Sequence, residues 1–174
     1  MNDTERRRFL RAALAGAGLA VAGTAAGQET GEDETTADDG ETTTATDAGL
    51  VTVESAESVG ATVERIEADV EDDGDLILVT TIDHAGNARN AGLDLRPTTL
   101  ILFGNPNLGT QLMQASQTAG IDLPQKLLVW EAADGTVNVT YNDPQWLADR
   151  HDIEGREEVL NTISGALETL ATGG

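Results

Sequence analysis

Residues 126–141, KLLVWEAADGTVNVTY, decide the fold class of this chain. The segments 126–132 and 136–141 are rich in apolar and β-branched residues and flank Asp134-Gly135. An Asp-Gly pair readily adopts the backbone angles that a tight hairpin turn needs. The pattern therefore predicts two antiparallel strands joined by a short turn.

Two further strands and five helices are predicted around this hairpin. The strands cover 76–82 and 98–103, the second a near-continuous apolar run suited to the interior of a sheet. Helical spacing and end signals predict helices over 59–70, 83–91, 105–119, from residue 143, and over 154–171. Helices interspersed with a sheet that contains a hairpin define the α+β class, here one domain over residues 50–174 with a four-stranded sheet. The link between the first two strands is long enough for a parallel crossover, so the strand order stays open.

The first 27 residues have the layout of an export signal. RRRFLR, residues 6–11, resembles the twin-arginine signature and precedes a weakly hydrophobic Ala/Gly run. Residues 28–49 hold eight acidic residues, seven threonines and no base, a composition that predicts a disordered linker. We therefore expect an exported protein, outside the cell or on the outer face of the cytoplasmic membrane. It would be held by the membrane only through an uncleaved signal.

The chain is strongly acidic: 31 acidic against 10 basic residues give a formal net charge of −21. From residue 50 onward 21 acids face six bases, and Lys126 is the only lysine in the sequence. No basic surface is available to neutralise phosphates, which excludes a nucleic-acid partner. Molar salt screens the self-repulsion of so acidic a surface, so the composition favours adaptation to high salt. The absence of cysteine excludes disulfides and thiolate chemistry.

Asp83-His84 is the first candidate for chemistry. Asp83 has the position of a helix N-cap, where its carboxylate accepts hydrogen bonds from the first turn. His84 would then lie at the first helical position, where the helix dipole disfavours a charged imidazole while the neighbouring carboxylate favours it. A neutral imidazole there could serve as a base or a metal ligand. Both the structural and the chemical interpretation stay open.

FGNP, residues 103–106, and YNDP, residues 141–144, follow predicted strands in the same way. Each places an N-cap residue, Asn105 or Asp143, before a proline at the first helical position. The free N–H groups of a helix start can bind an anion. Because proline removes one donor and the cap satisfies others, the capping interpretation is favoured over an anion site.

Arg96, Tyr141 and His151 complete the polar candidates. Arg96 could recognise a carboxylate or phosphate, or pair with a local acid, and Tyr141 has core packing as its default. His151 lies near a predicted helix end and receives no role, and two histidines without helical spacing predict no metal site. An N-glycosylation sequon begins at Asn138, which matters if the protein is exported.

Four segments together resemble the domain of unknown function 302 family, DUF302: they are IDHAGNARNAGLDLRPTTLILFGNP, GTQLMQ, IDLPQKLLVWE and YNDPQWLADRH. The resemblance spans residues 55–153 and departs from the family after Gly74, where Asp75-Leu76 stands in place of a frequent aromatic residue. It implies a curved, mainly antiparallel sheet backed by helices, in a domain that often pairs as a homodimer. The family brings no established reaction.

These observations favour a binding or accessory module over an enzyme. No nucleophile elbow, P-loop or dinucleotide fingerprint occurs, and the sequence indicates no particular cofactor. We expect the module to bind a small ligand or a protein partner through a pocket formed by six residues, Asp83, His84, Arg96, Asn105, Tyr141 and Asp143. Two alternatives stay open: a metal-assisted or hydrolytic enzyme that uses His84 with Asp83 and Asp143, and a structural protein of the cell envelope.

Overall fold

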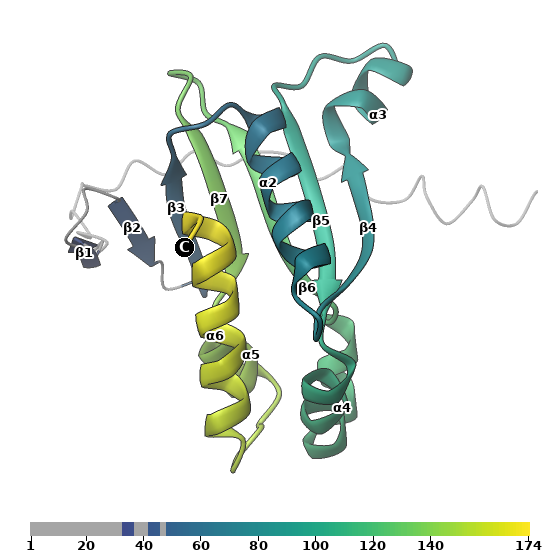
Figure 1. Cartoon of the computed structure of the whole chain (residues 1–174), viewed down its shortest axis with the longest axis vertical. Helices are drawn as coiled ribbons and strands as arrows, with labels where there is room; N and C mark the ends of the chain where they lie inside the picture. Colours follow the sequence, from purple (N-terminus) through teal and green to yellow (C-terminus); the bar gives the residue numbers. More distant parts are fainter. Residues whose placement is uncertain (1–32, 37–41, 46–47) are drawn as a thin grey trace, which may run out of the picture. The chain divides into compact units, whose positions relative to one another are not determined.

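The computed structural model describes residues 33–36, 42–45 and 48–174 (Figure 1). In chain order its elements are β1 (Asp33–Thr36), β2 (Thr42–Ala45), β3 (Leu50–Ser55), α2 (Val59–Asp72), β4 (Ile77–Asp83), α3 (His84–Asn90), β5 (Thr98–Gly104), α4 (Pro106–Ala115), the 3-10 helix η1 (Gln117–Ile121), β6 (Gln125–Glu131), β7 (Val137–Asn142), α5 (Pro144–Arg150) and α6 (Glu157–Thr172). The α+β class is confirmed. The predicted export signal, residues 1–27, lies outside the described residues and stays a prediction.

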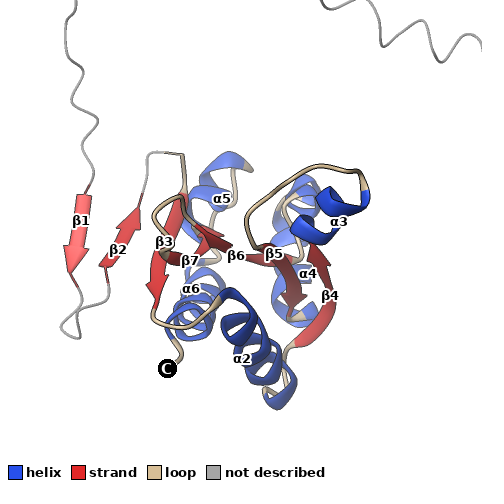
Figure 2. Ribbon diagram, turned by 90° about the horizontal axis from the view of Figure 1, so that it is seen from above, coloured by secondary structure: helices blue, strands red, loops and turns tan. Residues whose placement is uncertain are grey.

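The described strands form one sheet in the order β1-β2-β3-β7-β6-β5-β4, and every neighbouring pair is antiparallel. The hairpin at Asp134-Gly135 is confirmed as the turn between β6 and β7. β4 and β5 are antiparallel neighbours, which settles the order that the sequence left open. β3 and β4 lie far apart in the sheet, and α2 crosses one face to connect them (Figure 2).

The prediction of four strands was wrong, because the described sheet has seven. β3 was missed because its partner β7 lies almost ninety residues further along the chain, so no local turn signal connects the two strands. Its start is fixed by Gly49, which has a positive φ of 71° and leaves no room for a side chain against the Trp146 indole.

β1 and β2 fall within the segment for which the sequence predicted no ordered structure. β2 pairs with β3, whose outer edge offers free backbone hydrogen-bonding groups. Threonine fits a pleated strand well because it is β-branched, and three of the four residues of β2 are threonines. Low hydrophobicity therefore did not exclude strand pairing here.

All five predicted helices are confirmed in position, with shifts at their ends. Ser58, Asp83, Asn105 and Asp143 each cap a helix through a side-chain oxygen, and the last three confirm the N-caps named from the sequence. Gly92 follows α3 with a positive φ of 74°, as expected for a residue after a helix end. The helix predicted over 105–119 divides into α4 and η1, and the last helix starts only at Glu157.

The core lies between one face of the sheet and the helices α2 and α6, which run side by side across that face (Figures 1 and 2). Strand residues that alternate toward the helices, such as Ile101, Leu127 and Val139, are fully buried. Ile66 and Leu167 meet them from the helices, also without exposure to solvent. Apolar residues that repeat every two positions in the strands and about every 3.6 positions in the helices thus form one apolar layer.

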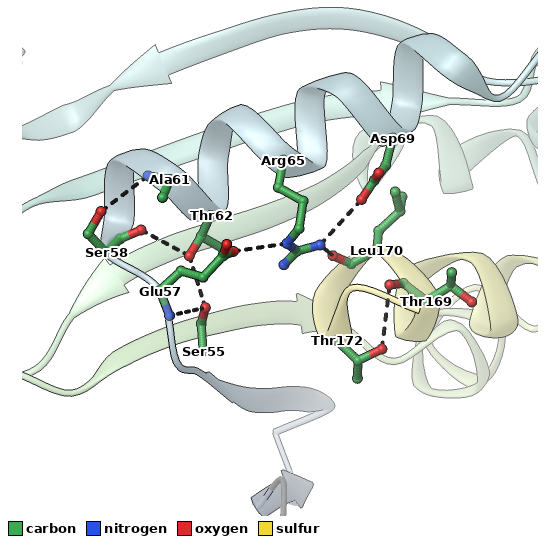
Figure 3. Close-up of polar contacts among 10 residues, drawn as sticks. All are labelled: Ser55, Glu57, Ser58, Ala61, Thr62, Arg65, Asp69, Thr169, Leu170 and Thr172. Atoms are coloured by element: carbon green, nitrogen blue, oxygen red, sulfur yellow. Dashed lines mark hydrogen bonds and ion pairs between the residues drawn. The ribbon is translucent and has the colours of Figure 1, made fainter. Parts of the chain in front are cut away.

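Arg65 ties α2 to the end of α6 (Figure 3). Its guanidinium donates to the main-chain oxygen of Leu170 at 3.0 Å and pairs with Glu57 at 3.0 Å and Asp69 at 3.3 Å. A carbonyl in the last turn of a helix has no partner within the helix, so Arg65 satisfies a group that would otherwise depend on water. Arg65 therefore connects α2 with α6 and also pairs with two carboxylates.

We expect Arg65→Met to lower the free energy of unfolding by about 1.5–3 kcal/mol, because it removes charge-assisted hydrogen bonds but keeps an apolar stem. Arg89→Met is the matched control. Arg89 pairs only with Asp83 at 3.3 Å, and both side chains are more than half exposed, so its loss should cost at most about 0.5 kcal/mol. Chemical unfolding in molar KCl measures both. Equal effects of the two substitutions would contradict the assigned role.

Candidate functional site

A largely apolar groove of about 380 Å³ is formed where the start of β4, the helix α4 and the segment before β6 come together. Its walls include Ile77 and Val79 of β4, Leu108 and Met113 of α4, and Leu123 with Pro124 from the loop before β6. Ile77 and Val79 are 54% and 57% exposed although they are aliphatic. A cavity of this size and polarity is typical of a small-molecule site.

The local sequence keeps this groove open. The register between β4 and β5 shifts between Leu78 and Thr80, and Val79 lies at that shift. Such a bulge redirects side chains at the edge of a sheet. Gly104 and Gly109 contribute no side chains, and a Cβ on Gly109 would already contact Leu123 at 3.7 Å. Larger residues at these positions would therefore project into the groove.

Gln125, the first residue of β6, supplies the main polar feature of the groove. It is 8% exposed, lines the groove, and its Nε2 has no hydrogen-bond partner among the described residues. A buried amide without a partner costs roughly 1–3 kcal/mol. A rotation of the side chain that turns this buried Nε2 toward the groove would let an acceptor atom on a bound molecule offset that cost.

Asn105, one of the six predicted pocket residues, lines the same groove. Its Oδ1 accepts from the backbone N–H groups of Asn107 at 2.9 Å and Leu108 at 3.3 Å. The start of α4 is therefore already satisfied by its own cap. Asn105 shapes the wall of the groove, and these donors are not available to an anion.

The six predicted residues do not converge on one concavity. Asp83, His84 and Arg96 lie at the end of the sheet near α3, whereas Asn105, Tyr141 and Asp143 lie near α4 and α5 (Figure 1). Asp83 is opposite Thr99 on β5, and Asn105 follows six residues later, so the two are separated by roughly 20 Å along the strand.

Asp83 and Arg96 of the first group make local structural contacts. Asp83 caps α3, accepting from Gly86 N at 2.7 Å and pairing with Arg89. Arg96 donates through Nε to the main-chain oxygen of Glu131 at 3.0 Å. The contact of Asp83 matches the capping interpretation, whereas Arg96 bonds to a main-chain oxygen and forms no ion pair with a carboxylate among the described residues.

Asp143 lies beyond the far end of the sheet from His84 and caps α5 through Gln145 N at 2.8 Å. His84 and Asp143 lie at opposite ends of the sheet, which removes the geometric basis for an enzyme built from His84, Asp83 and Asp143. Groups of three or more possible metal ligands are also absent from the described residues.

Three residues with close polar contacts were not selected from the sequence. His151 is bonded through both ring nitrogens, to Thr118 and to Asp122. Only the folded structure shows that His151, Thr118 and Asp122 lie together, because the three residues share no sequence motif. Gln125 had a usable signal: it shares the strand parity of the buried Leu127 and Val129, which makes it a polar residue at a core position.

The chain combines an antiparallel α+β domain with an apolar groove at one end of its sheet. It belongs to the family described as "Domain of unknown function DUF302", whose model matches residues 51–170. A crystal structure of an uncharacterized conserved DUF302 protein from Bacillus stearothermophilus has the same fold, with a TM-score of 0.63 and 21% identity over 71% of this chain and 95% of that one. The family resemblance of the sequence is confirmed.

Curated relatives come from Brucella. The "Fluoride-specific ion channel FluC 1" of Brucella suis is 46% identical over 127 residues, which are 73% of this chain and 47% of that protein. FluC 2 of Brucella melitensis has the same identity, with 44% of its length covered. The chain thus spans about half the length of these relatives. None of the helices that the structure describes is long and apolar enough to cross a membrane.

Burial raises the pKa of Tyr141 to about 12, and the negative charges of Glu168 and Asp143 add to the rise. Because the chain has a single tyrosine, its tyrosinate absorbance reports this group alone. We expect a titration midpoint of about 12 in the folded protein, against about 10 in the unfolded chain.

The raised pKa of Tyr141 also fixes the sign of the pH effect on stability. The contribution of Tyr141 to the free energy of unfolding is constant below pH of about 10. It falls as the pH rises toward about 12, because the tyrosine loses its proton at lower pH in the unfolded chain than in the folded protein. Comparison with Tyr141→Phe isolates this loss from other alkaline groups. A midpoint near 10 in the folded protein would contradict the burial of this hydroxyl.

Proposed function

We propose that this domain is a ligand-binding accessory module whose groove takes a small, uncharged and mainly apolar molecule with one hydrogen-bond acceptor. The observation that carries the proposal is an apolar groove with Gln125 in its wall, because the buried Nε2 of this residue has no hydrogen-bond partner among the described residues. A site of this kind gains affinity from burial of apolar surface and orientation from one donor.

The electrostatics support an uncharged ligand. No charged side chain is found among the described residues that line the groove. From residue 50 onward the chain carries a net charge of −15, counting 21 acidic and six basic residues. An anionic ligand would be repelled by this surface and would meet no cation in the groove.

The relatives support the accessory part of the proposal. In Brucella suis the matched domain makes up 47% of a protein named as a fluoride-specific ion channel. More than half of that protein therefore lies outside the match. We propose that the DUF302 domain is an attached module in those proteins, and that this chain provides the same module behind an export signal.

Binding of prodan, an uncharged fluorophore with a carbonyl acceptor, tests the groove. We expect the full chain in molar KCl to bind prodan with a rise in fluorescence. Gly109→Leu should weaken binding about tenfold or more, because its side chain fills the groove. Gly165→Leu is the matched control on α6, where an added Cβ meets nothing within 4 Å. Equal binding by the two variants would rule out this groove.

Gln125→Leu separates recognition from stability in the same assay. We expect it to raise the free energy of unfolding by about 1 kcal/mol or more, because it removes a buried donor without a partner. It should also weaken prodan binding, because the carbonyl of the probe loses its donor. A variant that is less stable than the wild type would show that Gln125 has a structural partner instead.

We also propose that the protein is exported and adapted to high salt, and each part is tested by a separate measurement. Cell fractionation of the native source should find the folded polypeptide outside the cytosolic fraction. The free energy of unfolding should rise from dilute buffer to molar KCl, because salt screens the repulsion among acidic side chains. Recovery from the cytosol alone, or greatest stability in dilute buffer, would contradict these two parts.

A further inference from the structure

His151, Thr118 and Asp122 form a hydrogen-bonded chain outside the groove. His151 caps the end of α5, Thr118 lies in η1, and Asp122 follows η1. The Nε2 atom of His151 is 2.6 Å from Asp122 Oδ2, and its Nδ1 atom is 2.9 Å from Thr118 Oγ1. Both distances lie within the range at which a base activates a nucleophile and is oriented by a third group.

Thr118 is the solvent-exposed member of this chain. The side chains of His151 and Asp122 are 6% and 14% exposed, whereas Thr118 is an exposed residue. The hydroxyl is therefore the member that a substrate can approach, while the imidazole behind it is shielded from water. Ser116 adds a further hydroxyl at 3.1 Å from Thr118 Oγ1.

The surroundings hold Asp122 in place. Arg150 approaches its second carboxylate oxygen at 3.6 Å and lies 5.4 Å from the centre of the Trp146 ring. Lys126 donates to the main-chain oxygens of Asp122 at 2.5 Å and Pro124 at 3.1 Å. The loop before β6 is thus fixed from both sides.

This arrangement determines which imidazole nitrogen carries the proton. A carboxylate only accepts hydrogen bonds, so the 2.6 Å contact places the proton of a neutral His151 on Nε2. Nδ1 is then an acceptor directed at the Thr118 hydroxyl. The order hydroxyl–imidazole–carboxylate is that of hydrolases with a catalytic triad, with the two ring nitrogens interchanged.

We propose that Thr118 is the nucleophile of a second site that hydrolyses small, uncharged esters, with His151 as its base and Asp122 as a positioning residue. As Thr118 Oγ1 bonds to the carbonyl carbon of the ester, its proton passes to Nδ1 of His151. The bond from that carbon to the alkoxy oxygen then breaks, and the alcohol leaves with the proton from His151. An acyl group remains on Thr118.

Water completes the reaction. It attacks the acyl carbon and gives a proton to His151, and the released Thr118 oxygen takes that proton back as the acid leaves. No metal, cofactor or oxidant is needed for this sequence. The uncharged substrate follows from the net charge of −15 carried by residues 50–174, from 21 acids and six bases.

Hydrolysis of p-nitrophenyl acetate by the full chain in molar KCl tests the proposal. We expect Thr118→Val and His151→Gln to lower kcat/KM about 100-fold or more, while Thr118→Ser keeps most of the activity. His84→Gln and Thr162→Val are the matched controls and should leave the rate unchanged. Thr162 is an exposed threonine on α6 whose hydroxyl bonds only within its helix.

Two further readouts separate catalysis from structure. Asp122→Asn should change the pH profile of kcat, because the imidazole loses its carboxylate partner. A fluorophosphonate probe should label Thr118, as located by peptide mass spectrometry. Circular dichroism and thermal unfolding check that each variant is folded. Full activity in folded Thr118→Val, labelling of another residue, or a wild-type rate equal to that of His84→Gln/His151→Gln would overturn the proposal. None of these results depends on prodan binding in the groove.

Discussion

Burial of one face of the sheet beneath α2 and α6 is the constraint on which the rest of the structure depends. Ile66, Ile101, Leu127 and Leu167 are fully buried at this contact. Each such side chain contributes about 1.5–3 kcal/mol when it is removed from water. That apolar layer opposes the repulsion of a strongly acidic surface. The helices α2 and α6 do not cover the ends of the strands. Both proposed sites lie near those ends.

The same short motifs therefore serve two purposes. Asn105 starts α4 by capping its first turn and also forms part of the groove wall. Gly104 ends β5 beside it and leaves space that a side chain would restrict, since a Cβ there would meet Pro124 at 3.6 Å. Capping and ligand binding are not competing explanations at this position. The cap uses the backbone donors, and the remaining apolar surface forms the groove.

Local signals predicted much of the fold, and long-range contacts set the limit. The hairpin turn, the four N-caps and the five helices all depend on residues close together in the sequence. β3 depends on β7, and the groove depends on the approach of β4, α4 and the loop before β6. His151 lies 29 residues from Asp122 and 33 from Thr118, so no spacing rule connects them. His84 carried the more visible motif, but the fold gives His151 the partners.

The basic residues show how a very acidic domain can avoid dependence on surface ion pairs. Six bases occur from residue 50 onward, and four of them donate to main-chain oxygens: Arg65 to Leu170, Arg96 to Glu131, Lys126 to Asp122 and Pro124, and Arg156 to Gln111. Salt at molar concentration screens exposed ion pairs over a few ångströms. A hydrogen bond to a carbonyl oxygen depends on direct contact, so screening weakens it less. Burial lowers the pKa of Lys126 despite the nearby carboxylate of Asp122, which indicates that this contact is partly withdrawn from solvent. The scarce cations thus connect backbone segments, an arrangement that supports the proposal of a salt-adapted protein.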